Sequence, residues 1–194
     1  MTTSTLESRA VHPITRRFSV EEYERMAQSG LFDPDERLEL LDGRIVHMSP
    51  IGPLHAAVVL RLNTLLNRLL VGRYLISVQN PIRLGAQSEP QPDVLMLHPR
   101  HDYYATAHPT PSEVLLVVEV ADPTNSYDRS IKLPLYAAAG IAEVWLVALA
   151  QQQIEQYYHP IGDQYGSKQT YSRGACITAH GVSGLELEVD DILG

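Results

Sequence analysis

The sequence predicts an α/β or α+β domain built on a mixed β-sheet. Residues 114–118 and 144–149 are continuous apolar runs, which are typical of central strands covered on both faces. A helical pattern lies between them, at 128–139, and from residue 154 onward short alternating segments are separated by glycines. This order predicts a strand–helix–strand unit followed by a C-terminal antiparallel meander.

The N-terminal part predicts a helix and a hairpin. Ser19 and Glu22 stand three residues apart, as in a capping box, so a helix is expected to begin there and to end before Gly30. Asp42-Gly43 supplies the two positive-φ positions of a type I′ turn, and apolar residues flank it on both sides. Residues 37–49 are therefore expected to form an N-terminal β-hairpin.

The middle of the chain predicts the remaining elements. The clearest helix is expected over residues 54–71, where apolar side chains recur at helical spacing on one stripe: Leu54, Val58, Leu62, Leu65, Leu66, Leu69 and Leu70. Residues 74–84 predict a strand whose Pro81 suits a sheet edge or a bulge, and residues 94–97 predict a short strand. Pro134 lies inside the helix at 128–139, so its first turn is expected to be irregular or its axis kinked.

Length and composition limit the class of protein. The 194 residues suffice for one domain with a sizeable core, expected over 16–194 after a flexible tail at 1–15. Apolar residues make up 44 % and charged residues 20 %, which excludes disorder along the whole chain. No apolar run approaches the roughly 20 residues that cross a bilayer, and no signal-peptide core is found. The single cysteine, Cys176, excludes an internal disulfide framework. A cytoplasmic protein without a membrane anchor is expected.

The charge balance of the chain limits how it could bind nucleic acid. Fifteen Lys and Arg against 23 Asp and Glu leave a formal net charge of −8, which argues against a protein that coats nucleic acid. An enzyme acting on nucleic acid needs only a local positive surface. Between Arg44 and Ser88 the chain has no acidic residue but four further arginines: Arg61, Arg68, Arg73 and Arg83. These are either contacts to a DNA backbone or the solvated side of a helix and its loops.

A carboxylate lies at each of two predicted buried strands. Asp93 directly precedes one of them, and Glu119 follows the apolar run 114–118. Because burying an unpaired carboxylate costs several kcal/mol, each needs a cation, a metal ion or hydrogen-bond donors beside it. On neighbouring strand ends the two would suit Mg²⁺ or Mn²⁺. The alternative is that Glu119 is solvated where its strand emerges and that Asp93 caps a turn.

Lys132 is one of only two lysines in the chain, the other being Lys168. It lies on the helix that follows the Glu119 strand, four residues after Asp128 and four before Tyr136, so these side chains share one face. An ammonium near a metal ion can orient or deprotonate water, which arginine cannot do at neutral pH. The alternative is an ion pair between Lys132 and Asp128 on a solvated surface.

The ordered motifs of the chain resemble those of one known family. They are Leu38-Glu39-Leu40-Leu41-Asp42-Gly43, Ser49-Pro50, His55, Pro92-Asp93, Glu119-Val120, Pro123-Thr124, Asp128, Lys132, Tyr136, Ala139-Gly140-Ile141 and Glu143-Val144-Trp145-Leu146-Val147. The combination is similar to the mostly bacterial family of "putative restriction endonucleases", long catalogued as a domain of unknown function, in the PD-(D/E)XK nuclease superfamily. The resemblance runs from about Phe18 to the C-terminus, and its specificity lies in the ordered set, because no single piece is specific.

The resemblance implies a restriction-endonuclease-like core, in which a mixed sheet has helices on both faces and the catalytic groups lie on a central hairpin. Asp93 and Glu119 match the two carboxylates of the superfamily motif. The lysine of that motif, expected two residues after Glu119, is replaced by Ala121, and Lys132 on the next helix stands in its place. In the following loop, Asp122 stands where the family has a serine.

The implied activity is hydrolysis of phosphodiester bonds in DNA with Mg²⁺ or Mn²⁺. Asp93, Glu119 and the backbone carbonyl of Val120 would hold one ion, and Glu39 would assist a second. Lys132 would position the attacking water and neutralise developing charge. His55 would be a proton relay, a phosphate contact or a structural hydrogen-bonding group.

Two other classes of function remain open. One is a catalytically silent binding or interaction module on a nuclease-like fold, which the net charge of −8 favours. The other is a structural or partner-regulating protein. For the nuclease, a homodimer is expected, because two strands must be cut with one active site per chain.

Overall fold

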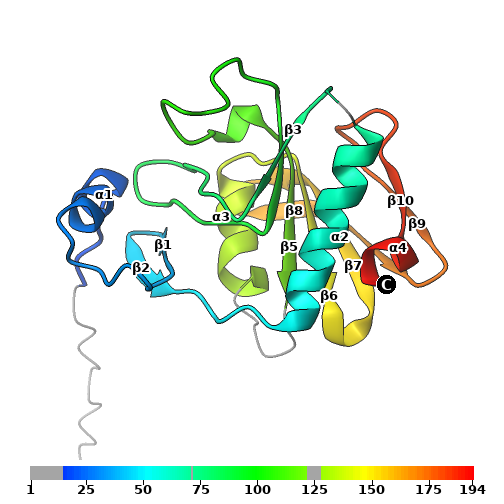
Figure 1. The fold of residues 1–194 in the computed structure, drawn as a ribbon, viewed down its shortest axis with the longest axis horizontal. Helices are drawn as coiled ribbons and strands as arrows, with labels where there is room; N and C mark the ends of the chain where they lie inside the picture. Colours follow the sequence, from blue (N-terminus) through cyan, green and yellow to red (C-terminus); the bar gives the residue numbers. More distant parts are fainter. Residues whose placement is uncertain (1–14, 71, 122–127) are drawn as a thin grey trace, which may run out of the picture.

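The computed structural model describes residues 15–70, 72–121 and 128–194. Its centre is a six-stranded sheet in the order β3-β4-β5-β6-β7-β8, and two two-stranded sheets, β1-β2 and β9-β10, lie outside it (Figure 1). Within the large sheet β5 and β6 are parallel, and the other neighbouring pairs are antiparallel. The predicted mixed-sheet class is confirmed.

The strands are β1 (Leu38–Leu41), β2 (Arg44–His47), β3 (Leu75–Val78), β4 (Val94–Leu97), β5 (Val114–Ala121), β6 (Glu143–Ala148), β7 (Gln153–Ile161), β8 (Gln164–Ser172), β9 (Cys176–Thr178) and β10 (Glu186–Glu188). The helices of the described residues are α1 (Val20–Gln28), α2 (Pro53–Leu69), α3 (Leu133–Ala138) and α4 (Val189–Leu193). Short helical turns are η1 (Pro111–Glu113), the π turn η2 (Asp128–Lys132) and η3 (Leu149–Gln151). Within the described ranges no helix is both long and apolar enough to cross a membrane.

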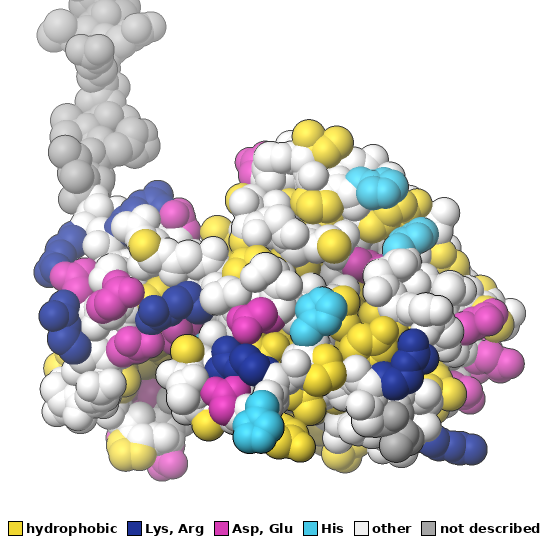
Figure 2. Space-filling view, turned by 90° about the horizontal axis from the view of Figure 1, so that it is seen from above, with side chains coloured by type: hydrophobic (Ala, Val, Ile, Leu, Met, Phe, Trp, Pro, Cys, Tyr) yellow, Lys and Arg dark blue, Asp and Glu magenta, His cyan; other side chains and the backbone are white. Residues whose placement is uncertain are grey.

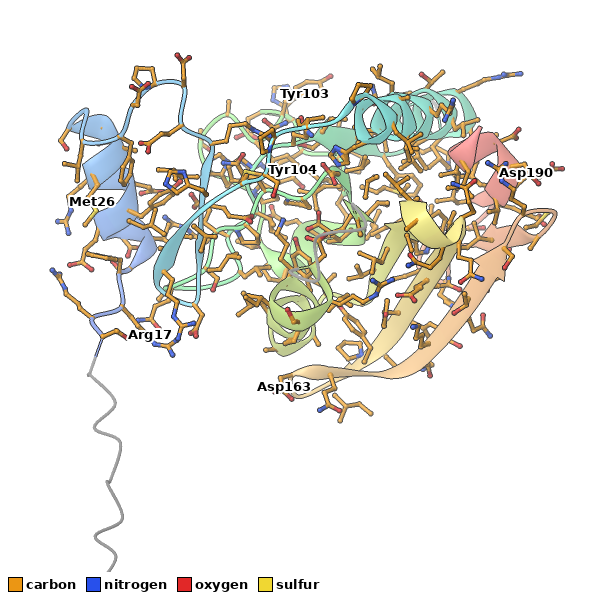
Figure 3. All side chains as sticks on the ribbon, turned by 90° about the horizontal axis from the view of Figure 1, so that it is seen from below. Arg17, Met26, Tyr103, Tyr104, Asp163 and Asp190 are labelled. Carbon is orange, nitrogen blue, oxygen red and sulfur yellow. The ribbon has the colours of Figure 1, made fainter. Side chains whose placement is uncertain are left out.

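Helices cover both faces of the large sheet. One apolar core lies between the sheet and α2 with α4, and a second lies on the side of α3. Figure 3 shows α2 and α3 on opposite sides of the strands. Successive side chains of a strand point to opposite faces, so Val118 of β5 packs on the α2 side and Val117 on the α3 side. Glu119, two residues after Val117, therefore points toward α3.

Local sequence patterns account for the N-terminal elements. Ser19 and Glu22 form both hydrogen bonds of the capping box at the start of α1. Asp42 and Gly43 have φ angles of 49° and 71°, as the predicted hairpin turn requires. The hairpin docks on the loop before β4, because the Glu89 N–H donates to the Leu40 carbonyl at 2.7 Å.

Two predicted elements differ in extent. The strand expected over 74–84 ends at Val78, because Gln79 adopts a positive φ of 52° and its N–H turns to the Asp93 carbonyl. The strand does lie at the sheet edge, as Pro81 indicated. On α2 the predicted apolar stripe is too broad. Leu54 and Leu69 are 51 % and 48 % exposed, because they lie in the first and last turns, beyond the buried middle of the helix.

The structure also shows how the irregular helix start and the C-terminal meander are built. Residues 128–132 form the π turn, so Pro134 falls in the first turn of α3, where a missing N–H breaks no helical bond. The antiparallel segments after residue 154 divide in two: β7 and β8 extend the large sheet, and β9 and β10 pair separately. The predicted tail at 1–15 (except Thr15), the Asp122 departure and the Pro123-Thr124 motif lie outside the described residues.

Candidate active site

A cleft of about 480 Å³ lies where the β1–β2 hairpin, the start of α2, the ends of β4 and β5 and the π turn meet. Six ionisable side chains that the sequence singled out line it: Glu39, His55, Asp93, Glu119, Asp128 and Lys132. Apart from His55, each of these residues is at most 7 % exposed. The cleft therefore holds ionisable groups of both signs away from bulk water.

Strand register explains why two acidic residues meet. Val94 of β4 pairs with Val118 of β5, so the next position of the same antiparallel register brings Asp93 opposite Glu119. Directly opposite side chains have Cβ atoms roughly 4.5–5.5 Å apart, and like charges at such positions are destabilising. The sheet tolerates this pair because donors and a cation surround it.

Lys132 supplies the cation. Its Nζ lies 3.2 Å from Glu119 Oε1 and 3.2 Å from Glu39 Oε2, and these contacts join the π turn to the large sheet and to the hairpin. Asp128 Oδ1 is 4.0 Å away. The interpretation of Lys132 and Asp128 as a solvated surface pair is therefore wrong, because both residues are buried. The displaced lysine reaches the end of β5 from the turn before α3.

Asp93 is fixed by three donors. Its Oδ2 accepts the Val120 N–H at 2.9 Å and lies 2.8 Å from His55 Nε2, and its Oδ1 accepts from Gln79 Nε2 at 3.1 Å. Within a β-strand the N–H and C=O of one residue point to the same edge. The Val120 carbonyl therefore lies on the edge of β5 that faces Asp93, and Val120 lines the cleft.

Burial controls protonation in the cleft. It raises the pKa of Glu119 to about 8 and that of Asp128 to about 6, although Lys132 opposes both shifts. Burial also opposes the charge on Lys132, but the carboxylates of Glu119 and Glu39 outweigh it and raise the pKa of the ammonium. Lys132 is thus protonated at neutral pH, and burial makes Glu119 the carboxyl of the cleft whose ionisation is most opposed.

Three further polar residues complete the site, and the sequence did not assign them to it. The Tyr136 hydroxyl donates to Glu119 Oε1 at 2.6 Å, the Gln91 N–H donates to Glu39 Oε2 at 3.1 Å, and Gln79 holds Asp93. The shared helix face of Lys132 and Tyr136 could have indicated the tyrosine. For Gln79 no local pattern exists, because its role depends on the turn after β3.

The four arginines proposed as DNA contacts lie elsewhere, and none lines the cleft. Arg61 donates to the Leu193 carbonyl, and Arg83 pairs with Glu24 at 2.7 Å. Arg73 lies over the Tyr74 ring. On the face shown in Figure 2, Lys and Arg side chains are interspersed with Asp and Glu and form no continuous basic stripe.

The donor set of the cleft fits a hard divalent cation. Among the described residues no group of three or more His, Cys, Asp or Glu side chains is placed to hold a metal ion. Two carboxylates and a backbone carbonyl nevertheless match Mg²⁺, which is usually held by one or two carboxylates and keeps several waters. Four buried carboxylates also outnumber the single buried ammonium. The residues present therefore fit such an ion.

A mixed sheet with helices on both faces and a buried acid–lysine cluster at facing strand ends defines a restriction-endonuclease-like fold. The chain belongs to the Uma2 family, described as "Putative restriction endonuclease", whose model matches residues 20–190. The resemblance drawn from the motifs is thus confirmed. A solved structure titled as a "putative nuclease belonging to DUF820", from Anabaena variabilis ATCC 29413, has the same fold. Its TM-score is 0.72 at 16 % identity, over 91 % of this chain and 97 % of that one. No curated protein matches the chain.

Proposed function

We propose that this chain is a metal-dependent endonuclease that hydrolyses phosphodiester bonds in DNA. The observation that carries the proposal is the buried ion pair of Lys132 and Glu119, 3.2 Å apart, at a strand end that faces Asp93. A purely structural role would not need two like charges on facing strands, and a buried ion pair is weak support for stability. Membership of a family described as "Putative restriction endonuclease" supports the same conclusion.

The proposed metal ligands are Asp93, Glu119 and the carbonyl of Val120, and the ion is Mg²⁺ or Mn²⁺. When bound, the ion supplies charge stabilisation at the phosphate and acidifies water. Asp93 is held in orientation for this by the Val120 N–H and His55, which favours a positioning role for His55. Glu39 already accepts from Lys132 and Gln91, so its proposed role is to anchor the lysine.

Lys132 acts in this mechanism as a fixed positive charge. Because the carboxylates around it raise the pKa of its ammonium, it is not the base that deprotonates water. It orients the attacking water by donating a hydrogen bond and stabilises the negative charge that develops on the phosphate oxygens. Tyr136 holds Glu119 from the other side, so the carboxylate keeps its place as charge develops.

The experiment that tests the proposal is cleavage of supercoiled plasmid with Mg²⁺ or Mn²⁺ and with EDTA. Wild-type protein should produce nicked or linear DNA only with the metal ion. Glu119→Gln and Lys132→Met should abolish cleavage. Lys168→Met should not, because Lys168, the other lysine of the chain, lies partly exposed on β8. Circular dichroism verifies that the variants are folded. Cleavage that survives either active-site change contradicts the assignment.

The alternative is a binding module without turnover on the same fold. The formal net charge of −8 favours it. DNA binding in EDTA, with no metal uptake in calorimetry and no cleavage, would support the alternative over the nuclease. The homodimer is part of the nuclease proposal, because both strands of a duplex must be cut, and light scattering of the purified chain tests it.

A further inference from the structure

Arg37 stands on the face of the hairpin that lines the cleft. Glu39 pairs with Val46 in the β1–β2 ladder, and the Met48 N–H continues the ladder by donating to the Arg37 carbonyl at 2.9 Å. Side chains two residues apart on a strand point to the same face. Arg37 and Glu39 therefore share one face, and both line the cleft.

Arg37 differs from the neighbouring cations in having no partner. Within the described chain its guanidinium makes no ion pair, side-chain hydrogen bond or ring contact, and the residue is only partly exposed. Lys132 has carboxylates on several sides, and Arg83 is paired with glutamates. Arg37 is the only arginine of the described residues that lines the cleft.

The charges that line the cleft indicate which ligand could pair with the Arg37 guanidinium. Among the described lining residues, Arg37 and Lys132 face four carboxylates, so the formal charge of these six groups is −2. A divalent cation at Asp93 and Glu119 would neutralise the cleft, while Lys132 stays beside the carboxylates of Glu119 and Glu39. An incoming phosphodiester, with one negative charge, then meets Arg37 as the lining cation without a partner. The planar guanidinium presents paired donors that match two phosphate oxygens.

We propose that Arg37 binds the phosphate backbone of the nucleic acid that enters the cleft, at a phosphate close to the one that is cut. The inference rests on the proposed function for its substrate class, but its test is binding rather than turnover. The hairpin would then supply two residues to the site: Glu39, which anchors Lys132, and Arg37, which contacts the substrate. The backbone contact carries no sequence information, so it would hold the strand without selecting bases.

The test measures fluorescence anisotropy of a fluorescein-labelled 20-nucleotide strand and of its duplex, in Ca²⁺, at several KCl concentrations. A gel verifies that the probes remain intact. For Arg37→Gln, the slope of log K against log salt should become less negative by about 0.9 on duplex or about 0.7 on the single strand, for one lost phosphate contact. The dissociation constant should rise most at low salt. Arg37→Lys should largely keep the wild-type slope, because it keeps the charge.

The matched control is Arg44→Gln, an exposed arginine of the same hairpin that does not line the cleft. It should leave both affinity and slope unchanged. If Arg37→Gln binds like wild type while the wild-type protein cleaves plasmid, the inference is overturned and the proposed function stands. If Arg37→Gln shows the expected loss but wild type does not cleave, the contact is upheld and the catalytic proposal falls. If wild type neither binds nor cleaves, both fall.

Discussion

His55 Nε2 lies 2.8 Å from Asp93 Oδ2, and this contact joins the first turn of α2 to the strand end that carries a candidate metal ligand. The same carboxylate oxygen accepts the Val120 N–H, while the other accepts from Gln79. Asp93 is thus oriented before any ligand arrives. Groups that orient a ligand in this way influence metal affinity without touching the metal.

Replacing His55 by alanine should weaken binding of Mn²⁺ by roughly 10–100-fold, because Asp93 loses an orienting partner. Titration calorimetry measures the affinity. His159→Ala is the control, since that side chain is exposed on β7 and does not line the cleft. Equal affinity in His55→Ala and wild type would show that His55 does not position Asp93.

Binding of a divalent cation should release protons near pH 7. Burial raises the pKa of Glu119 to about 8, and a metal ion binds the ionised carboxylate, so metal binding lowers this pKa and displaces protons near neutral pH. The affinity should therefore rise with pH between about 6 and 8. Calorimetry in two buffers of different ionisation enthalpy measures the release. A binding enthalpy that is the same in both buffers at neutral pH would contradict the prediction.

Lys132→Met should make stability pH-dependent in a defined direction. Without the ammonium, which lowers it, the pKa of Glu119 in the folded chain rises further above its unfolded value. A carboxyl with a raised folded pKa binds more protons when folded, so the free energy of unfolding falls as pH rises between the two values. The deficit relative to wild type should reach about 3–5 kcal/mol above neutral pH and shrink in acid.

Urea denaturation at acidic and alkaline pH measures this deficit for Lys132→Met. Lys168→Met is the control, because its side chain is 46 % exposed and the ion pair with Glu155 is partly solvated. Its effect should be below about 1 kcal/mol at both pH values. A deficit for Lys132→Met that is equal in acid and alkali would contradict the sign of the linkage.

Glu143 is a further buried carboxylate, outside the cleft, and its role is structural. Its Oε1 accepts from Trp145 Nε1 and Gln156 Nε2, both at 2.6 Å, and its Oε2 accepts the His180 N–H at 2.8 Å. Glu143→Gln replaces one acceptor oxygen by a donor, so a buried donor loses its partner. The free energy of unfolding should fall by about 1–3 kcal/mol, measured in urea. The exposed Glu186→Gln should show no such loss.

Elements defined by neighbouring residues were predictable from the sequence. The capping box of Ser19 and Glu22 and the turn at Asp42-Gly43 depend on contacts within three residues, so their patterns are complete in the chain. The apolar run 114–118 likewise indicated a central strand, because covering on both faces leaves no polar alternation.

The sequence indicated which residues belong to the candidate site, but it did not indicate how they are arranged. Spacing along the chain left open whether Lys132 was solvated, and the family resemblance, not geometry, joined it to Glu119. The register of β4 and β5 and the π turn determine that geometry, and both depend on long-range packing. Gln79 and Tyr136 escaped assignment for the same reason: each partner lies at least 14 positions away.

The β1–β2 hairpin forms a sheet of its own, joined to the body by the bridge between Leu40 and Glu89. Positions of the hairpin that line the cleft but do not dock on the body, such as Arg37, can therefore vary without repacking the six-stranded sheet. Changes at Arg37 should alter how strongly nucleic acid is held, while Leu40 preserves the docking. In directed evolution, libraries confined to this short rim should tune binding strength at little cost to folding.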